Sequence, residues 1–195
     1  MMKQRKQNRE FVTKLVLIAL FTALTTVFGF VKIPIMGVTV KMDLPILVIG
    51  ACILGPLAGA WLTVIPTAIT FFTGEAALFM TYSPGGTLLT LFLKGILAGL
   101  CAGLVHKALS GKHPFGATVL ASIVTPTVNS GVFLIGCYVF IWEELLALAA
   151  ANSVGIAVLM LGLVIINYIL ELILCVVVCP ILMRVIRTVT KNKYA

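Results

Sequence analysis

The sequence predicts an all-α membrane protein, a compact bundle of six transmembrane helices with both termini in the cytoplasm. The chain has 195 residues, of which 61% are hydrophobic and only 10% are charged, and its mean hydropathy is +1.19. A soluble domain carries about 25% charged residues. Apolar runs of about 18 residues or more recur along the chain, and such runs are typical of membrane-spanning helices. In addition, most of the lysine and arginine residues fall on one side of the predicted bundle.

Proline, glycine and charged residues divide the chain into six apolar segments. The segments cover residues 12–30, 44–55, 56–73, 87–107, 117–140 and 154–187. Pro56 opens the third segment, and proline suits the first turn of a helix. The second and third segments together offer barely enough residues for two spans of ~20 each. A re-entrant hairpin is therefore the alternative for this pair.

Lysine and arginine gather on one side of the predicted bundle. An even number of spans places both termini on the same side, and that side carries most of the 14 basic residues. The opposite side carries only Lys32 and Lys41. Because cytoplasmic loops are enriched in Lys and Arg, both termini are predicted to be cytoplasmic. The net charge of +8 is then explained by topology and contact with the lipid bilayer, and no nucleic-acid partner is expected.

Small residues recur at four-residue spacing in the middle of the chain. The stretch "KGILAGLCAGL" contains Gly95, Gly99 and Gly103, and "LGPLAGAW" contains Gly55 and Gly59. Small residues on one face let helix backbones approach closely in lipid. For the fourth segment, the predicted role of these glycines is packing inside the bundle.

The first segment carries a notch of small residues on an otherwise bulky helix. The stretch "LIALFTALTT" places Ala19 and Ala23 four residues apart. Such a notch can seat another helix, either of this chain or of a partner. The spacing alone leaves both alternatives open.

Several features together resemble the substrate-binding S component of energy-coupling factor (ECF) vitamin transporters. They are the short basic N-terminus, the AxxxA pattern, the long first outer loop and the stretch "LPILVIGACILGPLAGAW". The resemblance covers nearly the whole chain and implies one integral-membrane substrate-binding domain over residues 1–195. It also implies a multi-pass protein of the bacterial cell membrane, which takes a small vitamin from outside and works with a membrane coupling subunit and two ATPase subunits. By this resemblance Ala19 and Ala23 would dock the coupling subunit, and the loop Val31–Asp43 would be a lid.

Polar residues lie at similar depth in three of the predicted helices. Lys94 lies about 5 Å from the centre of its helix at ~1.5 Å rise per residue, and Asn129 lies at the centre of the next. Asn167 and Glu171 are one turn apart on one face of the last helix. Charged groups at this depth face a bundle interior or a water-filled cavity. These residues are therefore predicted to form a polar layer at the floor of an outward-facing cavity.

Two roles for Lys94 follow from this layer. Lys94 can pair with Glu171 and hold the two helices in register, or it can face a carboxylate of the ligand, and both roles can hold together. Tyr82 and Trp142 lie near the predicted outer ends and are further candidates for ligand contact. Alternatively, these two residues belong to the belt of aromatic side chains that membrane proteins place at the membrane–water interface.

The sequence carries no signature of an enzyme. It contains no HExxH, GxSxG or P-loop motif, so no catalytic residue, metal site or cofactor is predicted. The rival function is a stand-alone small-molecule membrane carrier. Because the chain lacks an ATPase motif, active transport would take its energy from a partner or a gradient.

The identity of the vitamin is predicted from conflicting hints. Pantothenate is favoured, because it is a small anion that Lys94 can meet, and because "TVNSGVFLIG" resembles the fifth helix of pantothenate-type S components. The stretch "VKMDLPILVIG" resembles the first loop and second helix of the riboflavin type. Riboflavin and folate are therefore the alternatives.

Overall fold

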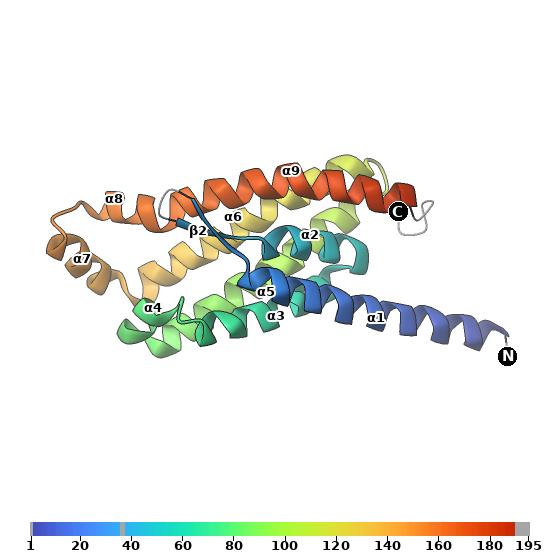
Figure 1. Cartoon of the computed structure of the whole chain (residues 1–195), viewed down its shortest axis with the longest axis horizontal. Coiled ribbons are helices and arrows are strands. Elements are labelled where there is room, and N and C mark those ends of the chain that lie inside the picture. The colour runs from blue at the N-terminus through green and yellow to red at the C-terminus, as the bar shows by residue number, and fades with distance from the viewer. Residues whose placement is uncertain (1, 36–37, 190–195) are drawn as a thin grey trace.

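The computed structural model describes residues 2–35 and 38–189. The elements in chain order are α1 (Met2–Phe30), β1 (Lys32–Ile35), β2 (Val38–Lys41), α2 (Asp43–Leu54), α3 (Pro56–Phe72), α4 (Ala77–Tyr82), α5 (Pro84–Leu109), α6 (Pro114–Phe140), α7 (Trp142–Ala151), α8 (Ile156–Met160), the π-helical segment η1 (Leu161–Ile165) and α9 (Ile166–Val189). The long helices run roughly along one axis, and the first and last described residues lie at the same end of the molecule (Figure 1). The helical fold class is confirmed.

Four of the described helices are long and apolar enough to cross a membrane. They are Gln7–Phe30, Pro84–Leu109, Pro114–Phe140 and Ile166–Thr188. The helix α2 has 12 residues and α3 has 17. At ~1.5 Å per residue, α2 extends about 18 Å, which is shorter than a hydrocarbon core of ~30 Å. The chain is thus a multi-pass membrane protein, while six complete spans and cytoplasmic termini stay predictions.

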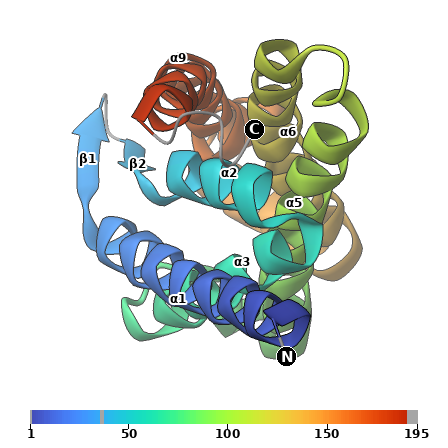
Figure 2. The same ribbon diagram turned by 90° about the vertical axis from the view of Figure 1, so that its right-hand side faces the viewer.

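The short helix α2 lies in the centre of the bundle. Leu47, Val48 and Ile49 are 4%, 0% and 3% exposed, and α2 contacts α1, α3, α5, α6 and α9. Figure 2 shows it surrounded by its neighbours when the molecule is viewed from the end that carries the first and last described residues. The chain turns between α2 and α3 at Gly55, whose φ of 96° lies in a region that favours glycine. Burial on all sides explains why α2 is apolar throughout although it does not span by length.

The helices α3 and α5 approach each other at glycines. A Cβ added at Gly99 would meet the backbone carbonyl of Gly59, and one at Gly103 would meet the backbone of Pro56. A Cβ at Gly95 would lie 3.1 Å from the Cβ of Thr63. The predicted packing role of the glycines in the fourth segment is therefore confirmed, with α3 as the neighbouring helix.

The connections predicted to lie outside the membrane contain secondary structure that was not predicted from the sequence. β1 and β2 form an antiparallel hairpin that pairs Lys32 with Lys41 and Ile35 with Val38. Gly37, in the turn of the predicted lid, lies outside the described residues. The stretches around Tyr82 and Trp142, which lie between the predicted apolar segments, contain the short helices α4 and α7. The role of the hairpin as a lid stays a prediction.

Candidate functional site

A cavity of about 480 Å³ lies inside the helix bundle. Its volume falls within the range of about 300–1,000 Å³ that is usual for small-molecule sites. The apolar part of its lining includes Leu47, Leu62 and Phe133. The polar residues of the lining are Thr25, Asp43, Thr63, Thr67, Thr70, Glu75, Lys94, Asn129, Ser130, Asn167 and Glu171. The cavity therefore combines apolar walls with many hydrogen-bonding and charged groups.

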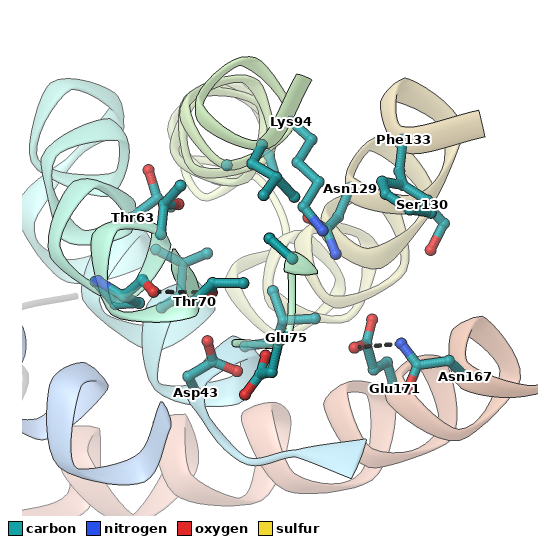
Figure 3. A pocket seen from close by; sticks show the side chains of 18 of the residues that line it. Asp43, Thr63, Thr70, Glu75, Lys94, Asn129, Ser130, Phe133, Asn167 and Glu171 are labelled. Carbon is teal, nitrogen blue, oxygen red and sulfur yellow. Dashed lines mark hydrogen bonds between the residues drawn. The ribbon is translucent and has the colours of Figure 1, made fainter. Parts of the chain in front are cut away.

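All four residues of the predicted polar layer line this cavity. Lys94 comes from α5, Asn129 from α6, and both Asn167 and Glu171 from α9. Figure 3 shows Lys94 and Asn129 on one side of the cavity and the carboxylate of Glu171 across from them. The sequence thus located residues that the fold brings together, while their contact with a ligand stays a prediction.

The ammonium group of Lys94 lies against an aromatic wall. Its Nζ is 4.9 Å from the ring centroid of Phe133, within the distance over which a cation is attracted to a ring face. Phe133 itself packs edge-to-face on Phe79 of α4, with the ring centroids 5.2 Å apart. These contacts hold the positive charge inside the cavity, and the suggested pairing of Lys94 with Glu171 stays a prediction.

Asn167 and Glu171 form a hydrogen-bonded pair on one turn of α9. The Nδ2 of Asn167 donates to Oε1 of Glu171 at 2.9 Å, as the four-residue spacing favours. Glu171 is only 6% exposed. The Oδ1 of Asn167 is buried and accepts no hydrogen bond from the described residues. A buried acceptor without a donor costs ~1–3 kcal/mol, so a donor group on a ligand would stabilise this site.

Two carboxylates of the cavity lining are not among the candidates predicted from the sequence. Asp43, which ends the predicted lid loop, and Glu75 both line the cavity and lie close together in Figure 3. Asp43 is the first residue of α2, and Glu75 lies in the turn that follows α3. Because α2 is too short to span, its first residue lies within the bundle. The shortness of that segment was the available signal.

A stripe of threonines on α3 was also missed. Thr63, Thr67 and Thr70 line the cavity, and their spacing places them on one helix face. The hydroxyl of Thr63 donates to the carbonyl of Ala60 at 2.7 Å, and that of Thr70 donates to Pro66 at 3.1 Å. These hydroxyl oxygens are thus oriented to accept hydrogen bonds, which again suits a ligand rich in donors.

A π-helical segment contributes to the cavity wall directly before Asn167. Gly162 and Val164 of η1 both line the cavity. Such segments are rare and occur frequently at functional sites. In the sequence this stretch lies inside the sixth apolar segment, residues 154–187, which gives no sign of a π-helical turn.

Tyr82 and Trp142 do not line this cavity. Tyr82 ends α4 and packs against a cluster that includes Ile141 and Leu145. The ring of Trp142 lies 5.3 Å from that of Tyr138, centroid to centroid. Their contact with a ligand stays a prediction.

The AxxxA face of α1 lines a separate surface groove. Ala19 and Ala23 are both exposed. The groove lies between α1 and α3, and its lining residues are Leu15, Ile18, Ala19, Thr22, Ala23, Thr26, Trp61 and Ile65. No described helix of this chain covers the two alanines, so the notch is open to a helix from another molecule.

Comparison with known families agrees with this architecture. The family model described as "ECF transporter, substrate-specific component" matches residues 13–183. The matched range includes the alanine groove and every residue named above as lining the cavity. No curated protein and no solved structure matches the chain with significant similarity. The chain therefore belongs to the family of substrate-specific components of ECF transporters, which are transport proteins and not enzymes.

Proposed function

We propose that this chain is the vitamin-binding S component of an ECF-type importer in the cell membrane. Members of this family bind a small substrate and work with a membrane coupling subunit and ATPases. The observation that carries the proposal is the polar cavity of about 480 Å³ inside the bundle. The ligand enters this cavity from outside, and two ATPase subunits supply the energy for its delivery through the coupling subunit.

The charges of the lining bear on the choice of vitamin. Among the described residues, Asp43, Glu75 and Glu171 bring carboxylates to the cavity, and Lys94 brings an ammonium group. Negative charges in a low-dielectric site repel an anion. Pantothenate, which the sequence favours, would therefore rely on Lys94 to offset this repulsion. A neutral vitamin with many hydrogen-bond donors, such as riboflavin, fits the acceptor-rich lining better.

The alanine groove supports docking of the coupling subunit at α1. Its walls are apolar and exposed: Leu15 is 50% exposed and Trp61 is 53% exposed. The small side chains of Ala19 and Ala23 let a partner helix approach the backbone closely, which is the main source of helix association in lipid. The groove and the cavity have no lining residue in common, so docking and ligand binding can be tested separately.

We expect Ala19→Leu combined with Ala23→Leu to abolish co-purification with the coupling subunit and the ATPases. The added side chains fill the groove and prevent close helix approach. Ligand binding by the isolated variant should stay at the wild-type level. The matched control replaces Ala147 and Ala150 by leucine, because both are exposed on α7 and lie outside the groove. An intact complex with the α1 variant would contradict the docking assignment.

A stand-alone carrier is the second candidate, and reconstitution separates it from an S component. Proteoliposomes that contain only this chain should show little vitamin uptake, because an S component works together with a coupling subunit and ATPases. Liposomes that also contain the coupling subunit and the ATPases should take up vitamin. This uptake should require ATP on the side of the membrane where the ATPases are bound. Rapid equilibrating uptake by the chain alone would favour the carrier.

A further inference from the structure

A second polar site lies far along the bundle from the vitamin cavity, near the end of α9. A groove of about 440 Å³ runs between the first turns of α6 and the last turns of α9. Its lining includes Phe115, Pro180, Met183, Arg184 and Arg187. This end of the molecule also carries the first and last described residues (Figure 1). The groove has no part in the function proposed above.

Arg187 has a buried donor that nothing in the described chain satisfies. Its Nη2 lies 3.5 Å from Nε2 of His106, which is 7% exposed in the last turn of α5. The Nε of Arg187 is buried and has no hydrogen-bond partner among the described residues. A buried donor in this state costs free energy, and more so when the group is charged. The arrangement therefore leaves Nε able to donate to an acceptor that lies outside the described residues.

The charge of the groove indicates that this acceptor is an anion. Arg184 lies one turn before Arg187 on α9, so the two guanidinium groups share one side of the helix. The lining of the groove contains no acidic residue. Guanidinium groups bind phosphate through pairs of parallel hydrogen bonds. Two arginines without a carboxylate thus fit a phosphate group.

The apolar wall indicates that the phosphate belongs to a lipid. Phe115 is 59% exposed at the start of α6. On α9, Ile181 and Val177 next to the groove are 58% and 53% exposed, as expected of side chains that face acyl chains. A free phosphate ion would make no use of these residues. Basic pockets between helices at the cytoplasmic surface suit anionic headgroups.

We propose that this groove binds the headgroup of an anionic phospholipid. Arg184 and Arg187 hold the phosphate, His106 positions the guanidinium group of Arg187, and an acyl chain lies along Phe115 and Pro180. The lipid satisfies the buried Nε and fixes the end of α9 against α6.

Native mass spectrometry of the purified chain with added phosphatidylglycerol tests this proposal. We expect one phosphatidylglycerol to stay bound, in preference to phosphatidylcholine. Replacing Arg184 and Arg187 by glutamine should weaken phosphatidylglycerol binding at least tenfold. The matched control is Arg9→Gln, which removes the same charge from an exposed position on α1 and should leave the affinity unchanged. Equal binding by the double variant and the wild type would overturn the proposal.

Two further measurements separate the alternatives. Inorganic phosphate alone should neither compete with the lipid nor raise the unfolding temperature, and if it does both, the site is one for free phosphate. If the double variant does not fold, Arg184→Gln and Arg187→Lys take its place. Arg187→Lys keeps the charge but loses the Nε donor, so it should still weaken binding. Wild-type affinity in both single variants would overturn the assignment.

Discussion

We expect the Lys94→Met variant to bind the vitamin at least tenfold more weakly than the wild-type chain. Methionine keeps the length and apolar stem of the side chain but removes the charge that lies 4.9 Å from the Phe133 ring. A tenfold loss corresponds to about 1.4 kcal/mol of binding free energy. Titration calorimetry on the purified variant measures this loss. The control is Lys107→Met, an exposed lysine in the last turn of the same helix, which should bind normally.

A double variant separates the structural role of Lys94 from its role in binding. If Lys94 and Glu171 pair, removing one charge costs ~3–5 kcal/mol of stability, unless Glu171 takes up a proton. Lys94→Met with Glu171→Gln should then unfold at a higher temperature than Lys94→Met alone. The affinity of this double variant for the vitamin should stay below that of the wild-type chain. Full affinity in a folded double variant would mean that neither charge serves the ligand.

We expect Gly99→Leu to prevent assembly of the bundle. A Cβ at Gly99 would already meet the backbone of Gly59 and lie 2.9 Å from the backbone nitrogen of Ala60. The backbones of α3 and α5 must therefore separate to admit any larger side chain. Because α3 carries the threonine stripe and α5 carries Lys94, the cavity would be lost as well. Size-exclusion chromatography in detergent should show aggregation or no recovered protein.

A milder pair of variants gives this prediction a matched control. Gly99→Ala should lower the stability by ~1–3 kcal/mol, the usual cost of overpacking. Gly131→Ala places the same methyl group in α6, where nothing lies within 4 Å of the added Cβ. This control should be neutral or stabilising, since alanine is the better helix former by ~1 kcal/mol. Equal unfolding temperatures for the two variants would contradict the close approach at Gly99.

Much of the fold was predictable because lipid imposes a simple pattern. Apolar runs bounded by glycine, proline and charges gave segments that match α2, α3, α5 and α6 closely, while the first segment shares only its end, Phe30, with α1. The polar layer was predictable for the same reason. A residue such as Lys94 or Glu171 in an apolar run has few stable environments other than a shared interior cavity.

The remaining parts of the fold and of the cavity depend on tertiary contacts, which the hydrophobic pattern of the sequence does not reveal. The hairpin β1–β2 and the helices α4 and α7 are short, and short elements carry weak local signals. Asp43 begins α2 and Glu75 lies in the turn after α3, so neither stands inside a long apolar run. The central position of the short helix α2 brings Asp43 to the cavity, and the turn after α3 brings Glu75 there. The alanine and glycine patterns look alike in sequence, yet Gly99 packs against α3 while Ala19 lies open.

Direct binding of vitamins by the isolated chain tests the central claim, which is that the bundle cavity is a vitamin site. Pantothenate, riboflavin and folate are titrated separately into the purified protein in lipid nanodiscs. We predict that one of them binds with one-to-one stoichiometry, and that Glu171→Gln weakens it at least tenfold. The control Glu143→Gln changes an exposed glutamate on α7 outside the cavity and should bind normally. Failure of all three vitamins to bind, or unchanged binding by Glu171→Gln, would contradict the account.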